Sequence, residues 1–229
     1  MTMKRFPAEW ERQACVQLTW LHQGTDFADV YDRAVACFVN IAREISKREK
    51  LIIVCKSKQT AIDELGDVLN KNISFVEVDT NDVWARDHGA ITVFEDGKPV
   101  LYDFTFNGWG RKFPAEKDNA ITLQLYESGI FKSAEYRDMS RFVLEGGSIE
   151  TDGRGGVLTT ESCLLSKYRN PSMSKAEIEL FLKTTFNVQK VLWLSHGELA
   201  GDDTDGHIDT LARFVSEDTI AYVDCDNAN

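Results

Sequence analysis

The chain has 229 residues, of which 43% are hydrophobic and 28% are charged, and its formal net charge at pH 7 is −11. This composition is typical of a globular protein with one large core or two small ones. The sequence shows no cluster of basic residues, no apolar run near the ~20 residues of a membrane span and no apolar leader. We therefore expect neither a nucleic acid nor a membrane as partner. An acidic protein attracts cations, including small cationic substrates.

Five cysteines are scattered along the sequence, and no two of them form a C-x-x-C pair: Cys15, Cys37, Cys55, Cys163 and Cys225. Their odd number and irregular spacing do not indicate a disulfide framework. We interpret them as reduced thiols, most of them small core residues, in a protein of the cytoplasm.

Helical and strand patterns alternate along the whole chain. In chain order they predict a strand at 16–20, a helix at 26–48, a strand at 51–55, a helix at 58–70, strands at 73–78, 90–94 and 100–104, a helix at 115–131, strands at 148–151 and 156–160, a helix at 175–186, and strands at 191–194, 208–214 and 219–223. Ser174 and Glu177 predict a capping box at the start of the fourth helix. Helices and strands with short connections favour an α/β or α+β fold.

Three acidic residues, Asp87, Glu145 and Asp205, recur at near-equal spacing, and each opens a predicted hairpin. Asp-Gly pairs at the first two turns are strong hairpin signals. A helix and a strand precede each hairpin, which predicts similar units stacked around an axis. We therefore expect Asp87, Glu145 and the loop 205–209 to converge on one axial cavity. Because no helix follows the third hairpin, we expect the chain to be a C-terminally truncated form of a longer protein.

The segment Gly201–Asp209 reads Gly-Asp-Asp-Thr-Asp-Gly-His-Ile-Asp and combines four carboxylates with one histidine. His207 and Asp209 are two residues apart, so on a strand they would point to the same face. An imidazole and a carboxylate on one face suit proton transfer beside a bound cation, or a metal site. The simpler alternative is a solvated acidic loop in which His207 is hydrogen-bonded at the start of a strand.

A metal at this segment is the less favoured interpretation. A calcium loop of the EF-hand type would need acidic ligands where Gly201 and Ala212 stand. Zinc needs about three protein ligands, and none of the other histidines lies at a recognisable ligand spacing: His22, His88 and His196. A metal at this segment is therefore possible but not favoured.

Three further segments could contribute to a site, each with a structural alternative. Trp84 and Asp87 could bind a planar cation by stacking and charge, or they could belong to a surface loop with an Arg86 ion pair. Glu145 precedes two glycines, which indicates either a close approach of the backbone to a ligand or a β-bulge. Trp109 follows Asn-Gly in a turn and could either line a pocket or cover the core.

Taken together, these segments resemble agmatine deiminases and the bacterial, Porphyromonas-type, peptidyl-arginine deiminases. The match runs from residue 7 to the last hairpin and depends on six ordered motifs: Asn81-Asp-x-Trp-x-Arg-Asp87, Phe106-Asn-x-Trp-Gly110, Leu144-Glu-Gly-Gly-Ser-Ile149, Thr159-Thr-Glu-Ser-Cys-Leu164, Arg169-Asn-Pro171 and Gly201-Asp-Asp-Thr-Asp-Gly-His-x-Asp209. Six motifs in order are far more specific than any one of them.

The resemblance implies the pentein fold, a propeller of ββαβ units around a pseudo-fivefold axis with the active site at its centre. We expect residues 1–229 to form a single pentein-type domain that lacks its C-terminal part. The family hydrolyses a guanidinium group to a ureido group and releases ammonia. A cysteine attacks the guanidinium carbon and gives a covalent thiouronium intermediate, and no cofactor or metal is needed.

By motif matching, the resemblance implies that Asp87 and Asp209 clamp the guanidinium group and that His207 is the general acid and base. Trp84 and Trp109 would line the site, and Glu145 would support His207 or the substrate. Carboxylates grip the planar guanidinium fork well.

One departure from the family concerns the nucleophile. The family places its cysteine near the C-terminus, in a glycine-rich segment that ends in a His-Cys pair, and this sequence has no such segment. Cys225 lies between two aspartates, which would raise its pKa, so we do not assign it as nucleophile.

The most favoured function is therefore that of an agmatine deiminase that makes N-carbamoylputrescine, in a chain that is itself inactive. The alternatives are a peptidyl-arginine deiminase and a non-catalytic module that binds cationic amines. The expected partner is a small cationic substrate, and a homo-oligomer is left open.

Overall fold

The computed structural model describes residues 3–197 and 199–224, which form two compact units. Unit 1 comprises Met1–Glu11, Ala90–Phe113 and Ser133–Asn229, and unit 2 comprises Arg12–Gly89 and Pro114–Lys132. The chain therefore passes between the two units more than once, and neither unit is a continuous segment.

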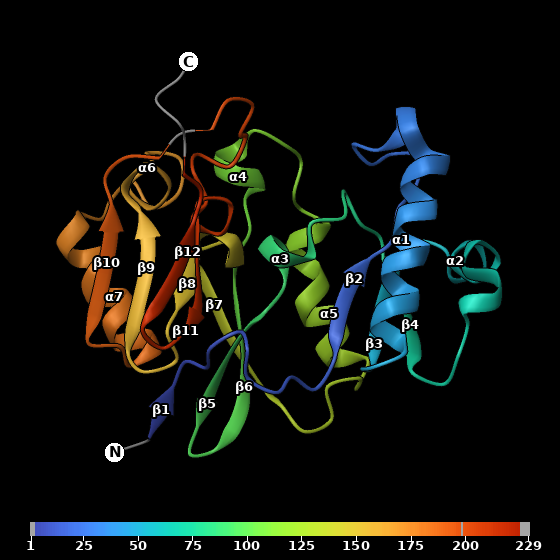
Figure 1. The fold of residues 1–229 in the computed structure, drawn as a ribbon, viewed down its shortest axis with the longest axis horizontal. Helices are drawn as coiled ribbons and strands as arrows, with labels where there is room; N and C mark the ends of the chain where they lie inside the picture. The colour runs from blue at the N-terminus through green and yellow to red at the C-terminus, as the bar shows by residue number, and fades with distance from the viewer. Residues whose placement is uncertain (1–2, 198, 225–229) are drawn as a thin grey trace. The chain divides into compact units, whose positions relative to one another are not determined.

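Unit 2 is built on a parallel sheet in which β3 (Leu51–Cys55) lies between β2 (Val16–Thr19) and β4 (Ile73–Glu77) (Figure 1). Its helices are α1 (Tyr31–Ser46), α2 (Lys58–Leu65), α3 (Ala85–His88) and α5 (Ile121–Glu127), with 3₁₀ turns η1 (Ala28–Val30), η2 (Gly66–Val68) and η3 (Asp118–Ala120).

Every residue of β3 is buried, because helices cover both faces of this strand. Leu51, Ile53 and Cys55 pack with apolar residues of α1 and α2. Ile52 and Val54 point to the opposite face and pack with apolar residues of α5. This two-sided burial explains why the strand reads as a continuous apolar run rather than an alternating one.

Unit 1 contains three sheets. The first has the order β1 (Lys4–Arg5), β5 (Ile91–Glu95), β6 (Lys98–Thr105) and β7 (Glu135–Val143); the second β10 (Lys190–Leu194), β9 (Gly156–Thr160) and β8 (Ile149–Thr151); and the third β11 (Ala212–Ser216) and β12 (Thr219–Tyr222). The remaining elements are α4 (Gly108–Arg111), α6 (Glu161–Leu164), α7 (Lys175–Phe186), η4 (Gly146–Ser148) and η5 (Ile208–Thr210). Its main core includes Val93, Val100, Tyr102, Val157, Leu164, Leu182 and Phe186.

A repeating ββαβ order is present in the described chain. The hairpin β5–β6 is followed by α5 and by β7, which pairs parallel to β6. The hairpin β8–β9 is followed by α7 and by β10, which pairs parallel to β9. The third predicted hairpin is β11–β12. At the first hairpin Asp96 and Gly97 both have positive φ, as the two-residue turn expected from Asp-Gly requires.

The structure differs from the sequence-based expectations mainly at element ends and at one strand. The helix expected at 26–48 begins at Tyr31 after a 3₁₀ turn, and the one expected at 115–131 is helical only over η3 and α5. The strand β7 was missed because its sequence is largely polar. It lies at the edge of its sheet, where charged side chains are common because they discourage pairing with other chains.

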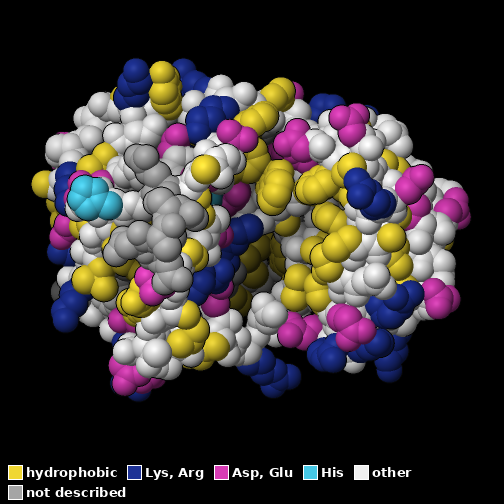
Figure 2. Space-filling view, turned by 45° about the horizontal axis from the view of Figure 1, so that its top comes forward, with side chains coloured by type: hydrophobic (Ala, Val, Ile, Leu, Met, Phe, Trp, Pro, Cys, Tyr) yellow, Lys and Arg dark blue, Asp and Glu magenta, His cyan; other side chains and the backbone are white. Residues whose placement is uncertain are grey.

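The surface carries charges of both signs. On the face drawn in Figure 2, Lys and Arg side chains lie among Asp and Glu side chains, and hydrophobic side chains also reach the surface. Among residues 3–197 and 199–224, no helix is both long and apolar enough to cross a membrane.

The predicted capping box opens α7, and it gives a test of the fold. Ser174 N–H donates to Glu177 Oε2 at 2.7 Å, and Glu177 N–H donates to Ser174 Oγ at 3.4 Å. We expect Ser174→Ala to lower the free energy of unfolding by about 1 kcal/mol, because a helix N–H loses its acceptor. Urea denaturation measures this change. The control is Thr184→Ala in the same helix, where the exposed hydroxyl only donates to helix carbonyls. Equal effects of the two substitutions would contradict the prediction.

Candidate functional site

The loop before His207 is folded by the side chain of Asp202. This carboxylate accepts hydrogen bonds from the backbone N–H groups of Thr204 at 2.8 Å and Gly206 at 2.6 Å. Asp205 and Gly206 have φ values of 68° and 83°, a region that aspartate tolerates and glycine adopts freely. A Cβ atom at Gly206 would lie only 2.8 Å from Ser162 Oγ. The Asp-x-x-Asp-Gly sequence is therefore what allows this tight turn.

His207 follows the turn and is buried, with 2% of its surface exposed. Its N–H donates to Thr204 Oγ1 at 3.0 Å, and its carbonyl accepts from Thr210 Oγ1 at 2.8 Å. The next residue, Ile208, is fully buried in a small apolar cluster. The hydrogen bonds with Thr204 and Thr210 and the burial of Ile208 therefore fix the backbone of His207.

The expectation that His207 and Asp209 lie on a strand is wrong. Residues 208–210 form the 3₁₀ turn η5, and the strand begins only at Ala212. His207 precedes this turn, whereas Asp209 lies within it and is half-buried. The argument that the two side chains share a strand face therefore fails, although both residues remain in one short loop.

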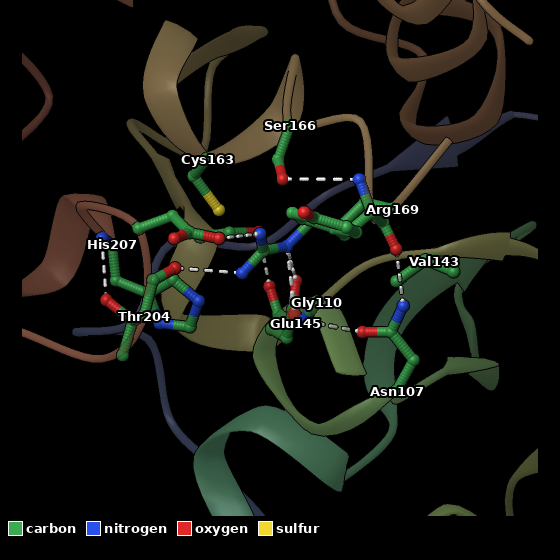
Figure 3. A network of polar contacts seen from close by, with 12 residues as sticks. Asn107, Gly110, Val143, Glu145, Cys163, Ser166, Arg169, Thr204 and His207 are labelled. Atoms are coloured by element: carbon green, nitrogen blue, oxygen red, sulfur yellow. Dashed lines mark hydrogen bonds and ion pairs between the residues drawn. The ribbon is translucent and has the colours of Figure 1, made fainter. Parts of the chain in front are cut away.

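Three buried side chains meet at this point: Glu145, Cys163 and His207. A carboxylate oxygen, the Sγ atom and an imidazole nitrogen all lie within 4.8 Å of one another, and Figure 3 shows them around the guanidinium group of Arg169. Glu145 comes directly before η4, Cys163 lies in α6 and His207 directly precedes η5. The loops of the second and third hairpins therefore come together inside unit 1.

Arg169 joins these loops through every branch of its guanidinium group (Figure 3). Its Nε donates to both carboxylate oxygens of Glu145, each at 3.0 Å. Its Nη1 donates to Asp205 Oδ2 at 2.6 Å, and its Nη2 donates to the carbonyl of Thr204 at 2.8 Å. The side chains of Arg169 and Glu145 both have 0% exposure, so this is a fully buried ion pair.

The charges in this network influence one another. Burial raises the pKa of Glu145, and the adjacent Arg169 opposes that rise. For Asp205, burial also favours the neutral form, but Lys112 and Arg169 together lower its pKa below the usual value. Burial opposes the charged form of Arg169 too, yet its acidic neighbours hold its pKa above the ordinary value. We therefore treat Arg169 and Asp205 as charged at neutral pH.

A left-handed turn adjoins the network. The four residues of α4 all have positive φ: Gly108, Trp109, Gly110 and Arg111. Asn107 closes this turn by accepting a hydrogen bond from Gly110 N–H at 2.9 Å. Directly after it, Lys112 Nζ lies 2.6 Å from Asp205 Oδ1. Successive left-handed residues that are not glycine are costly, and such strain often occurs at functional sites.

Trp109 lies inside this turn and is buried, with 6% exposure. Its ring packs edge-to-face against Phe106 and Phe113, at centroid distances of 5.0 and 5.6 Å. Trp109 therefore packs within an aromatic cluster, and its role in lining a pocket stays a prediction.

Trp84 and Asp87 lie in unit 2, at the start of α3. Asp87 is buried, with 7% exposure, whereas Trp84 is 42% exposed. The indole Nε1 of Trp84 donates to Asp82 Oδ2 at 3.2 Å, and its ring lies 6.1 Å from that of Phe27. Burial, with a further contribution from Asp26, raises the pKa of Asp82 to about 6. This part of unit 2 therefore presents a partly exposed indole next to carboxyl groups.

Two histidines of unit 2 have structural hydrogen bonds. His88 Nε2 lies 3.1 Å from Thr19 Oγ1, and His22 Nε2 lies 3.1 Å from Thr80 Oγ1. His88 directly follows Asp87, and its burial lowers its pKa to about 4. We therefore interpret His88 as a neutral anchor that attaches α3 to β2.

By residue type and spacing, Glu145, Cys163 and His207 could hold a metal ion. Arg169 argues against this use, because its Nε–H group faces both oxygens of Glu145. A fixed positive charge at that position repels a cation. The cluster therefore suits the movement of protons better than the binding of a metal.

Sequence analysis identified Glu145 and His207 but missed the roles of Arg169 and Cys163 in this cluster. Both residues lie in motifs on which the family resemblance depends, and this was the one sequence signal that could have identified them as site residues. Cys163 had been interpreted only as a core thiol, and its side chain is indeed fully buried. Cys225 lies outside the described residues.

The similarity to known proteins extends over almost the whole chain. The family described as Porphyromonas-type peptidyl-arginine deiminase matches residues 5–229. Agmatine deiminase of Pseudomonas aeruginosa (strain LESB58) is 36% identical over 228 residues, which are 96% of this chain and 61% of the relative. Agmatine deiminase of Stutzerimonas stutzeri (strain A1501) is 34% identical over 97% of this chain and 61% of its own length. The chain thus spans about three fifths of the length of these curated relatives.

Solved structures agree with the fold. An agmatine deiminase from C. jejuni with substrate bound is 36% identical, with a TM-score of 0.92 over 99% of this chain and 66% of its own. A Porphyromonas gingivalis protein, described provisionally as an arginine deiminase, is 47% identical, with a TM-score of 0.93 over 99% of this chain and 68% of its own. The mixed α/β fold with several sheets is therefore shared with these proteins.

The neutral state of His88 gives a pH-dependent prediction. Its pKa is about 4 in the folded protein and about 6.5 in an unfolded chain. Between these values the unfolded state binds a proton that the folded state does not, so stability from His88 is lost as the pH falls from about 6.5 towards 4. We expect the loss of unfolding free energy in His88→Gln to be smaller at pH 4.5 than at pH 7, by about 2–3 kcal/mol. Urea titrations at both pH values measure it, and an equal loss at both would contradict the prediction.

Proposed function

Because the chain belongs to the Porphyromonas-type peptidyl-arginine deiminase family, we propose that it carries the guanidinium-binding and proton-transfer residues of an agmatine deiminase. The proposed reaction converts the guanidinium group of agmatine to the ureido group of N-carbamoylputrescine and releases ammonia. The relatives named agmatine deiminase support this choice of substrate. We also propose that the enzyme acts in the cytoplasm, in the synthesis of putrescine.

One observation carries the proposal: His207 is buried and fixed beside the Glu145–Arg169 ion pair. In family chemistry, a cysteine thiolate attacks the guanidinium carbon, and an acid protonates the nitrogen that leaves as ammonia. Water then attacks the resulting thiouronium carbon, a base removes its proton, and the thiolate leaves. One imidazole that alternates between its two protonation states can serve both steps. The backbone bonds of His207 hold it in one place for this role.

The remaining site residues have separate proposed roles. Asp87 and Asp209 bind the guanidinium group through their carboxylates, since a planar cation prefers bidentate acceptors. Trp84, which is partly exposed, contributes an aromatic face to the cation. Glu145 supports His207 rather than the substrate, because both of its oxygens accept from Arg169. Trp109 acts indirectly, by filling the turn whose end contacts Asp205.

We further propose that the chain is part of a pentein propeller with ββαβ units around a pseudo-fivefold axis, as the described repeats support. In this proposal residues 1–229 are one pentein-type domain, and the nucleophilic cysteine lies in a C-terminal part that the present sequence does not include. Sequencing the gene beyond codon 229 tests this point. A glycine-rich segment with a His-Cys pair would support the enzyme, and its absence would favour the binding module.

A second candidate function is that of a peptidyl-arginine deiminase, which the description of the family favours. Agmatine remains the preferred substrate, because the matched motifs offer no evident cationic site for an α-carboxylate. We expect agmatine to bind more tightly than free arginine or a peptide that ends in arginine, in calorimetric titrations of the chain. Tighter binding of either carboxylate-bearing ligand would overturn the choice of agmatine and leave guanidinium recognition intact.

The clamp can be tested by removing single charges. We expect Asp87→Asn and Asp209→Asn each to weaken agmatine binding by about 2–5 kcal/mol, because each swap keeps the shape but removes a charge that faces a cation. Calorimetry measures the affinity. The matched controls are Asp79→Asn in unit 2 and Asp203→Asn in the same loop as Asp209, both exposed carboxylates. If the controls weaken binding as much as the clamp variants, the attraction is general and the clamp is refuted.

Activity of the chain gives a separate test. We expect the 229-residue chain not to release ammonia from agmatine, because covalent catalysis needs an accessible thiolate. Cys163 is close to His207, but it is fully buried and therefore not accessible to solvent. An ammonia assay checks this expectation. Release that disappears in Cys163→Ser or in Cys225→Ser would identify that cysteine as a nucleophile and contradict it.

A further inference from the structure

We propose that Arg169 is a positioning residue that determines where His207 and Glu145 lie. The proposal deepens the function given above and depends on it for the meaning of His207. Arg169 is not proposed to touch the substrate, and its effect is transmitted through the groups that it binds.

Arg169 is held rigidly in the structure. Its side chain has no exposed surface, and its backbone N–H donates to the carbonyl of Ser166 at 3.1 Å. A Cβ atom on Gly110 would lie 3.6 Å from Arg169 Nη1 and 3.5 Å from Asp205 Oδ2. The left-handed turn therefore lies beside the Arg169–Asp205 contact, at a distance where a Cβ atom would make ordinary van der Waals contact.

Arg169 is linked to His207 through one intervening residue, Thr204. Its Nη2 holds the carbonyl of Thr204, and the hydroxyl of Thr204 accepts the hydrogen bond from His207 N–H. Its Nη1 holds Asp205, which has an uncommon positive φ. Two points of the turn are thus fixed by one planar group, immediately before His207.

The Nε atom of Arg169 fixes Glu145 at the same time. Both oxygens of Glu145 accept from this one nitrogen, so the carboxylate faces Arg169. Because an oxygen of Glu145 lies within 4.8 Å of an imidazole nitrogen of His207, Arg169 also determines the charge that His207 experiences. Its guanidinium group therefore sets both the position and the electrostatic surroundings of the proposed acid and base.

These contacts require an arginine rather than a lysine. Only a planar fork can direct hydrogen bonds to a carboxylate, a second carboxylate and a carbonyl in three fixed directions. A lysine ammonium group is a single point of charge and cannot reach all three acceptors from one position. Lys112 provides a second cation, with its Nζ 2.6 Å from both Asp205 Oδ1 and the carbonyl of Asp203.

The test uses the 229-residue chain and needs no catalysis, so it stands whether or not the proposed reaction occurs. Nitrogen-15 NMR of the four histidine side chains reports the tautomer and surroundings of His207. Amide hydrogen exchange at Thr204, Gly206 and His207 reports the order of the turn. In Arg169→Lys we expect altered His207 ring-nitrogen signals and exchange at these amides that is faster by about tenfold or more, or about 1.4 kcal/mol.

The chain contains its own control for this measurement. In the turn before β9, Asp152 accepts hydrogen bonds from Arg154 N–H at 2.7 Å and Gly156 N–H at 2.8 Å, the same pattern that Asp202 makes. Exchange at these two amides should not change in Arg169→Lys. The matched variant is Arg137→Gln, which removes an Arg–Glu95 ion pair of the same unit and should leave the signals of His207 unchanged.

The outcomes separate positioning from general stability. Unchanged signals of His207 and unchanged exchange in Arg169→Lys would overturn the proposal. Equal changes at His22, His88, His196 and His207 would also overturn it, because they would show a global effect. If Arg169→Lys does not fold, Asp205→Asn weakens the contacts of residue 205 with Arg169 Nη1 and Lys112 Nζ and leaves the Nε and Nη2 contacts of Arg169 in place. The same selective increase in exchange is then expected, and its absence refutes the proposal.

Discussion

The structure of unit 1 depends on the need to satisfy one buried positive charge. Arg169 has no exposed side-chain surface, so each of its donors must find an acceptor inside the protein. The acceptors come from two different loops, one before η4 and one before η5. A displacement of either loop would leave a buried charge without its partner, which is far more costly than losing an exposed ion pair. The two loops are therefore fixed relative to each other by electrostatics as much as by packing.

The repeated architecture explains why such loops carry the candidate residues. After β4, β7 and β10 the chain leaves a strand, forms a short turn and enters a hairpin. Asp87, Glu145 and His207 each lie in one of these three connections. Connections between strands are free to carry polar residues, because they lie outside the regular ladders of the sheets. The chain thus repeats this order of elements three times, and the sequence places different chemistry in each connection.

The parts of this structure that were predictable from sequence are those set by local rules. Asp96-Gly97 predicted a hairpin turn, and Ser174 with Glu177 predicted the start of a helix. The apolar run at 51–55 predicted a buried strand. The features that could not be predicted are contacts between residues far apart in the sequence. Arg169 binds partners 24 and 36 residues away, and no local pattern identifies such a contact.

The prediction of a strand directly after His207 failed for another reason. The residues after it have the composition of a strand, but hydrogen bonds of Asp202 and Thr204 impose a turn before them. Local propensity was overridden by side-chain bonds to the backbone.

The two-sided burial of β3 has a consequence for the synthesis of the protein. On the ribosome, β3 emerges together with α1 and soon afterwards α2, which cover one of its faces. The other face must wait for α5, which is encoded beyond β6. Until then the nascent chain exposes Ile52 and Val54 on an unfinished sheet, a surface that chaperones recognise and that promotes aggregation. A pause in translation between β4 and α5 would therefore be more harmful to this protein than one after α5.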